Sequence, residues 1–172
     1  MRSQPSSATR PAWQSRPHQW LRIVTADVMN PAAISPAIAG ADAVLSALGP
    51  HGSGRTTISQ DSARSIIEAM QKTGARRLLT VSGSVVTDAG EGRVMRYLLK
   101  PLARRTLLRH VCADMRAAED EIQASHLDWT ILRPPRSNLP RGYTISCADL
   151  AACMLTLLND PATVHRHVSI AN

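Results

Sequence analysis

Short apolar runs alternate along this chain with longer segments whose apolar residues recur every three or four positions. The short runs are typical of buried strands, and the longer segments are typical of helices with one apolar face. Strands that are apolar along their whole length occur in parallel sheets that helices cover on both faces. The alternation therefore predicts an α/β fold, built as an open parallel sheet with flanking helices.

The bounds of the predicted elements follow from turn, cap and breaker residues. The expected strands cover residues 21–28, 42–49, 75–84, 129–132 and 165–172. The expected helices cover residues 31–39 and 56–74, a segment from near 104 or 105 to 125, and a segment from residue 147 onward.

Residues that favour helix starts stand at two of these bounds. Asn30 precedes Pro31, so Asn30 is predicted to cap the first helix, which Pro36 shortens or kinks. Ser146 is followed three residues later by Asp149, which is a capping-box variant with Asp in place of Glu.

The first 20 residues are rich in Pro, Ser, Gln and Arg and show no apolar period. Such a composition predicts a disordered tail over residues 1–20 and one domain over residues 21–172. No apolar run approaches the length of a membrane span, about 20 residues. Because no apolar signal core starts the chain either, we expect no membrane span and a cytoplasmic location.

The formal net charge of +7 raises the question of an anionic partner. Six basic residues between 93 and 109 could bind phosphates, or could form a solvated helix face: Arg93, Arg96, Lys100, Arg104, Arg105 and Arg109. Aromatic residues for base stacking are scarce among them, so we favour the solvated face and expect no specific nucleic acid.

Metal and thiol chemistry have little support in the sequence. His165 and His167 lack a nearby third ligand, so no metal site is expected. The three cysteines are few and odd in number, and we expect buried thiols in a reducing compartment. Glu119 and Asp120 are expected to be exposed and to pair with nearby arginines.

Small, polar and proline residues follow four of the predicted strands. In open parallel sheets, ligands bind beside the carboxyl ends of the strands, which lie at one edge. The stretch "HLDWTILRPPR" shows the pattern best, because two prolines that donate no N–H must end the strand just after Arg133. We interpret this turn as one wall of a ligand cleft, although prolines also end strands that have no functional role.

Five segments together resemble a known family: "ADV", "GADAVLSALGP", "TTISQDSARSIIEAMQKTGARRLLTVSGS", "DMRAAEDEIQASHLDWTILRPPR" and "ISCADLAACMLTLLNDPATVHRHVSIAN". In this order they resemble atypical short-chain dehydrogenases, in particular the NAD(P)H-binding, NmrA-like and flavin-reductase-like group, over residues 21–172. The resemblance implies a Rossmann-like sheet that binds NADP or NAD together with a small-molecule substrate.

The resemblance also implies cofactor-binding roles for the residues at the four strand ends. These are Asp27 and Val28 beside the adenine, Ala47, Leu48, Gly49 and Pro50 along the ribose and pyrophosphate, Ser82 and Gly83 beside the nicotinamide, and Arg133, Pro134 and Pro135 over it. A hydroxyl of Ser82 or Ser84 would be catalytic as a hydrogen-bond donor or proton relay, although Ser and Gly are also ordinary turn residues.

The family's glycine-rich strand–turn–helix, GxxGxxG, is missing from the sequence. The fold is therefore expected to be N-terminally truncated, with two neighbouring family strands absent and with edges that favour a homo-oligomer. Tyr97 and Lys100 stand one residue too close for the Tyr-x-x-x-Lys pair of ordinary short-chain dehydrogenases.

Two functions remain open from the sequence. The first is an NAD(P)(H)-binding oxidoreductase that transfers a hydride between a nicotinamide and a small acceptor. The alternative is a non-catalytic NmrA-like redox sensor or partner-binding protein, or a degenerate fragment that has lost dinucleotide binding.

Overall fold

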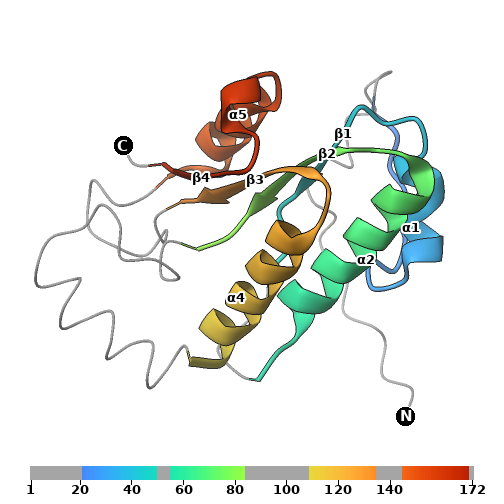
Figure 1. Cartoon of the computed structure of the whole chain (residues 1–172), viewed down its shortest axis with the longest axis horizontal. Helices are drawn as coiled ribbons and strands as arrows, with labels where there is room; N and C mark the ends of the chain where they lie inside the picture. The colour runs from blue at the N-terminus through green and yellow to red at the C-terminus, as the bar shows by residue number, and fades with distance from the viewer. Residues whose placement is uncertain (1–20, 50–54, 84–108, 135–144, 171–172) are drawn as a thin grey trace, which may run out of the picture.

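The computed structural model describes residues 21–49, 55–83, 109–134 and 145–170 (Figure 1). Its elements in chain order are α1 (Pro31–Ile38), β1 (Ala43–Ser46), α2 (Ile58–Thr73), β2 (Arg77–Val81), α4 (Arg109–Ala124), β3 (Asp128–Arg133), α5 (Cys147–Leu158), the short 3-10 helix η4 (Pro161–Thr163) and β4 (Arg166–Ser169).

The four described strands form one sheet in the order β1-β2-β3-β4, and every neighbouring pair is parallel. Helices α2 and α4 cover one face of the sheet, α5 lies on the other, and α1 packs beside α2 (Figure 1). The predicted α/β fold, a Rossmann-like open parallel sheet flanked by helices, is therefore confirmed.

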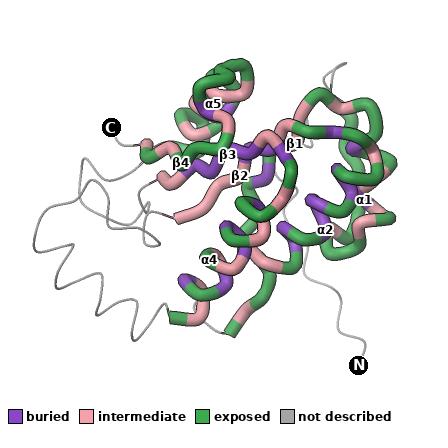
Figure 2. Tube along the Cα trace, viewed as in Figure 1, coloured by how far each residue is buried: buried purple, intermediate pink, exposed green. Residues whose placement is uncertain are grey.

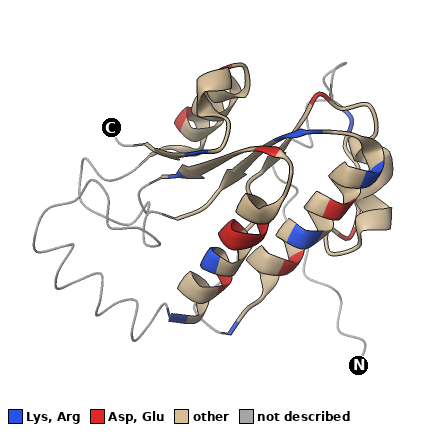
Figure 3. Ribbon diagram, in the orientation of Figure 1, with Lys and Arg blue, Asp and Glu red and all other residues tan. Residues whose placement is uncertain are grey.

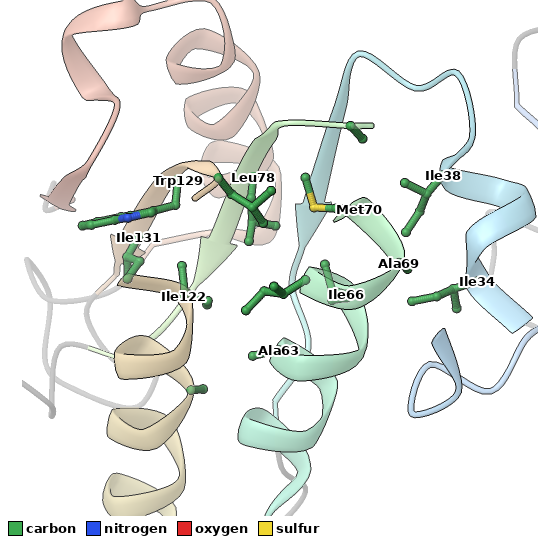
Figure 4. Packing of buried hydrophobic residues seen from close by; sticks show 14 residues of the cluster. Ile34, Ile38, Ala63, Ile66, Ala69, Met70, Leu78, Ile122, Trp129 and Ile131 are labelled. Carbon is green, nitrogen blue, oxygen red and sulfur yellow. The ribbon is translucent and has the colours of Figure 1, made fainter. Parts of the chain in front are cut away.

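The core fills the space between the sheet and the α2–α4 pair. Leu78 of β2 and Ile131 of β3 are completely or almost completely buried there, against Ile66 and Met70 of α2 and Ile122 of α4 (Figure 4). Burial is concentrated in the central strands and on the inner sides of the helices (Figure 2). Each large apolar side chain that leaves water here contributes about 1.5–3 kcal/mol, which fixes the strands and hence their carboxyl ends.

Local signals set the helix ends as the sequence predicted. The Asn30 side chain accepts a hydrogen bond from the Ala32 N–H, and α1 is short, with Pro36 inside it. Ser146 accepts from the Asp149 N–H at 3.0 Å. Helix α2 ends at Gly74, whose φ of 81° lies in the left-handed region that glycine adopts without strain.

The predicted strand over residues 21–28 is wrong. The segment contains no strand, and its first apolar residues stay in water, with Leu21 and Ile23 each 52% exposed. Apolar content favours a strand only where a neighbouring strand accepts its backbone hydrogen bonds. Within the described residues, β1 pairs only with β2, so 21–28 has no such neighbour there.

Several expectations fall outside the described residues: the disordered tail over residues 1–20, the helix start near residues 104 and 105, and most of the basic segment from residue 93 onward. The described part of the chain contains no helix long and apolar enough to cross a membrane. Among the cysteines, Cys112 is buried as expected, but Cys147, the first residue of α5, is exposed.

Candidate functional site

Three parallel strands end at the same edge of the sheet. The ladder between β2 and β3 continues one residue beyond β2, because the Ser82 N–H donates to the Leu132 carbonyl at 2.7 Å. This hydrogen bond places Ser82 and Gly83 directly beside the end of β3, where Arg133 is the last strand residue. Two of the predicted strand ends therefore meet.

A narrow cavity of about 30 Å³ opens between this edge and helices α2 and α4; we call it the strand-end cavity. Such a volume holds about one or two water molecules, so a larger ligand would lie at its mouth. Its lining includes Leu48, Met115 and Glu119, together with five hydroxyl side chains: Ser46, Ser59, Ser62, Thr80 and Ser82.

Two of these hydroxyls are buried and have no hydrogen-bond partner among the described residues. The Oγ atoms of Ser59 and Ser82 are both buried and unpartnered. Buried polar atoms are paired in the great majority of cases, because an unmade hydrogen bond costs about 1–3 kcal/mol. The Ser82 hydroxyl is therefore free to donate to a ligand atom at the strand ends.

Helix α4 approaches the end of β2 at Gly83. A Cβ atom placed on Gly83 would lie 2.9 Å from the Cε atom of Met115. The absence of a side chain at Gly83 thus lets the Met115 thioether lie against the backbone next to Ser82, on the wall of the strand-end cavity.

A buried ion pair joins α4 to the end of β3. The Arg133 Nε and Nη2 atoms donate to Glu119 Oε1 at 3.2 Å and to Oε2 at 2.5 Å. The side chains are 14% exposed for Arg133 and 5% exposed for Glu119. The expectation that Glu119 is exposed was wrong. The sequence held a signal, because Glu119 lies four residues after Met115 and three before Ile122, on the apolar stripe of α4.

The start of α2 is occupied by a carboxylate from α4. Asp114, which is 5% exposed, accepts hydrogen bonds from the N–H groups of Ser59 and Gln60, each at 3.0 Å. A free helix N-terminus attracts phosphate groups, and here the same donors and the same end of the helix dipole already hold an anion. A phosphate at this helix would have to displace Asp114.

Acidic and basic residues are spread along α2 and α4 (Figure 3), and one ion pair joins the two helices on their exposed side. Arg64 donates to Glu121 through Nε at 2.8 Å and through Nη2 at 2.5 Å. The hydrogen bond from Arg64 lowers the pKa of Glu121, with a smaller contribution from Gln60.

On the same face as Arg133, the Trp129 ring lies between two histidines, with ring centroids 5.6 Å from His165 and 5.4 Å from His167. Burial lowers the pKa of His167, the positive charge of Arg133 lowers it further, and Glu119 acts in the opposite direction. No group of three metal-ligating side chains occurs in the described residues.

The predicted site residues fall into three groups. Ala47, Leu48 and Gly49 follow β1, Ser82 and Gly83 follow β2, and Arg133 and Pro134 end β3; Leu48 and Ser82 line the strand-end cavity. Asp27 and Val28 lie in the turn before α1 instead of at a strand end, and Val28 packs against the core under α1. Pro50, Ser84 and Pro135 lie outside the described residues, as do Tyr97 and Lys100.

A family model described as NAD(P)H-binding matches residues 6–161, which is most of the chain. This chain belongs to the NAD(P)H-binding family. The expected membership of an NAD(P)H-binding family is thereby confirmed.

A curated protein is also similar to the chain in sequence. The chain is 29% identical over 160 residues to the UPF0659 protein YMR090W of Saccharomyces cerevisiae; the match covers 81% of this chain and 66% of the yeast protein. The chain thus spans just under two thirds of the length of this curated relative.

Solved structures share the fold. A short-chain dehydrogenase/reductase from Veillonella parvula, solved in complex with NADP, has a TM-score of 0.66 at 18% identity, over 90% of this chain and 74% of that one. A Rossmann-fold NAD(P)-binding family protein from Shigella flexneri has a TM-score of 0.55 at 26% identity, over 86% of this chain and 68% of that one.

At the described strand ends the structure leaves room for a ligand, but the described residues form no free pyrophosphate site. Ser82 offers an unpartnered hydroxyl, and a Cβ atom on Gly49 would meet no other atom within 4 Å, so the backbone there is open to approach. Pyrophosphate groups bind at free helix N-termini after glycine-rich turns. The described segments contain no such turn, and Asp114 occupies the start of α2.

Proposed function

We propose that this chain is an NAD(P)(H)-dependent oxidoreductase whose substrate meets the nicotinamide at the carboxyl ends of β1, β2 and β3. The observation that carries the proposal is the buried, unpartnered Ser82 hydroxyl at the end of a central strand, in a member of an NAD(P)H-binding family. The bound dinucleotide would supply or accept the hydride.

The chain's own residues would orient both partners. In the reducing direction the hydride would pass to the substrate carbon, and the substrate oxygen would take a proton from water through the Ser82 hydroxyl. Ser82 would donate a hydrogen bond to the substrate oxygen on which negative charge develops. Leu48, Gly49 and Gly83 would line the nicotinamide and ribose positions, and Arg133 and Pro134 would close over the ring. Met115 would exclude water from the side of α4, because its thioether lies against Gly83.

Dinucleotide binding is tested first, by thermal-shift titration with NADPH and NADH. A ligand that binds only the folded state adds RT ln(1 + [L]/Kd) to the stability, about 2.7 kcal/mol at a hundredfold excess over Kd. For a chain of this size we expect a saturable rise in Tm of about 5–10 °C. A cooperative melt without a shift at millimolar dinucleotide would refute the proposal.

Turnover is tested next, by following oxidation of the preferred reduced dinucleotide with a panel of carbonyl and flavin acceptors. Ser82→Ala should lower kcat by about 100-fold or more while Kd for the dinucleotide changes little. Ser65→Ala is the matched control, because Ser65 also has a buried, unpartnered Oγ but lies outside the strand-end cavity. Equal losses in the two variants would exclude a role for Ser82.

Binding without turnover would instead favour the non-catalytic redox sensor that the missing glycine-rich turn also allows. We further propose a cytoplasmic location, which the exposed thiol of Cys147 supports, because exposed thiols persist in reducing compartments.

A further inference from the structure

The Glu119–Arg133 ion pair is more than a link between a helix and a strand. Like the contact of Met115 with Gly83, it brings α4 against the strand ends. Arg133 is the last residue of β3, and its backbone pairs with Ser169 of β4. Because Pro134 follows at once, the backbone of Arg133 is restricted to extended conformations.

A buried ion pair is not the most stable choice at this position if stability is its only role. Two buried charges lose their hydration, and an apolar pair of similar volume is often as stable or more stable. An ion pair differs from an apolar pair in its directionality. Two parallel hydrogen bonds between a planar guanidinium and a carboxylate fix the rotation and the distance of both groups.

Glu119 also lies on the wall of the strand-end cavity, together with Ser82 and Met115. The buried Glu119 carboxylate contacts Arg133. Ala118 and Ile122, which are close to Glu119 on α4, belong to the hydrophobic core. The Ser82 N–H donates to the carbonyl of Leu132, the residue before Arg133. If loss of the ion pair moved Arg133, the neighbouring Leu132 carbonyl would move too, and with it the backbone of Ser82 that is hydrogen-bonded to this carbonyl.

We propose that Glu119 is a positioning residue, which acts through Arg133 to hold the carboxyl end of β3 and the neighbouring Ser82 in the geometry that receives the nicotinamide. The proposal rests on the proposed function for its ligand. Its geometric part, that the ion pair fixes the Ser82–Leu132 end of the ladder, stands on the structure alone and has its own readout.

The first readout is amide hydrogen exchange, measured residue by residue by NMR without ligand. In Glu119→Gln, exchange of the Ser82 amide should accelerate about tenfold more than exchange of Leu79 in the middle of the same strand. In the double variant Glu119→Leu/Arg133→Met, an apolar pair should restore the urea midpoint while Ser82 exchange stays fast. A purely structural pair predicts the opposite: all core amides accelerate together in Glu119→Gln, and the double variant restores Ser82 to the wild-type rate.

The second readout is the Kd for NADPH and NADH. Both Glu119 variants should bind the preferred dinucleotide about tenfold more weakly, which corresponds to about 1.4 kcal/mol. Glu121 lies on the same helix as Glu119. Glu121→Gln removes the charge from the exposed pair that Glu121 forms with Arg64 of α2, and it should leave both Kd and Ser82 exchange unchanged. Ile67→Val, a core change outside the strand-end cavity, controls for destabilisation.

The two readouts separate the possible failures. Fast Ser82 exchange with an unchanged Kd would overturn the link between Glu119 and the dinucleotide. If the wild-type chain binds neither NADPH nor NADH, the proposed function is wrong, and the proposed link between Glu119 and the nicotinamide is wrong as well. The exchange rates then still decide whether the ion pair fixes the end of β3: a wild-type Ser82 rate in the apolar double variant would overturn that as well.

Discussion

Arg77 joins the sheet to the C-terminal end of α5, and replacing it gives a direct test of what stabilises the fold. From β2, its guanidinium donates to the carbonyl of Asp128 at 2.9 Å and to Thr130 Oγ1 at 2.8 Å, both on β3. Outside the sheet, it also donates to the carbonyl of Leu157 in α5 at 2.9 Å and to Thr163 Oγ1 in η4 at 3.0 Å. Burial lowers the pKa of Arg77 below its ordinary value, while Asp128 and Asp160 oppose the change, and an arginine remains charged.

The magnitude follows from these four contacts. A protein hydrogen bond contributes about 0.5–1.5 kcal/mol net, and a cation at the C-terminal end of a helix such as α5 adds about 0.3–1 kcal/mol. Because Arg77 is only partly buried and the hydroxyls of Thr130 and Thr163 keep other partners, we expect Arg77→Met to cost about 3 kcal/mol. Arg77→Lys should recover less than half, because an ammonium group cannot span both sides of the network.

Urea unfolding and thermal melts measure this cost, and Arg76 supplies the control. The Arg76 side chain is 71% exposed and makes one 3.3 Å contact with Asp128. We expect Arg77→Met to lower Tm by about 6–12 °C, and Arg76→Met to change the stability by no more than about 0.5 kcal/mol. A Tm for Arg77→Met within about 2 °C of the wild type, or equal effects at both positions, would refute the reasoning.

Three further predictions follow from the other contacts. Asp114→Ala should lower the free energy of urea unfolding by about 2–3 kcal/mol, because two N–H groups at the start of α2 lose a charged acceptor. Asp114→Asn should cost less, and equal costs for the two variants would show that the negative charge of Asp114 does not contribute. Gly83→Ala should lower the stability by only about 1 kcal/mol, because the new Cβ clashes with the flexible end of Met115. Gly83→Ala/Met115→Ala should relieve this clash, and a loss of stability in the double variant larger than the sum of the two single losses would contradict the contact. The pKa of His167 is lower in the folded chain than its ordinary 6.5, so between these two values the unfolded chain binds more protons, and stability falls as the pH drops through this window; His167→Asn should reduce the slope of stability against pH there, and an unchanged slope would exclude His167 as its source.

The sequence predicted those parts of the fold in which local and long-range preferences agree. The strands around Leu78 and Ile131 carry consecutive apolar residues that are buried on both faces, so their pattern and their environment coincide. The caps at Asn30 and Ser146 depend on neighbouring residues only, and they were predictable for that reason.

The strand predicted over residues 21–28 failed because strand formation depends on a partner that local composition does not reveal. The apolar stretch at Leu21 and Ile23 has strand propensity, but among the described residues no neighbouring strand accepts its hydrogen bonds. The distinction between a strand and an extended exposed segment lies in tertiary pairing.

The sequence predicted which residues lie at the strand ends, but it did not predict which side chains they contact. The strand-end rule located Leu48, Ser82 and Arg133 from the sequence. The partner of Arg133 could not be assigned by separation along the chain, because Glu119 lies 14 residues earlier and on a different element. Its place on the apolar stripe of α4 was the available signal, and a charged residue on such a stripe indicates a buried partner.

The most direct test of the account is a map of the backbone amides that respond when NADPH, and separately NADH, is titrated into the labelled chain. The account predicts saturable NMR shift changes that centre on Leu48, Gly49, Ser82, Gly83 and Arg133, with α5 unaffected. Changes confined to the open groove between the starts of α2 and α4, around Arg55 and His110, would contradict the strand-end site, and no saturable change with either dinucleotide would contradict dinucleotide binding by this chain.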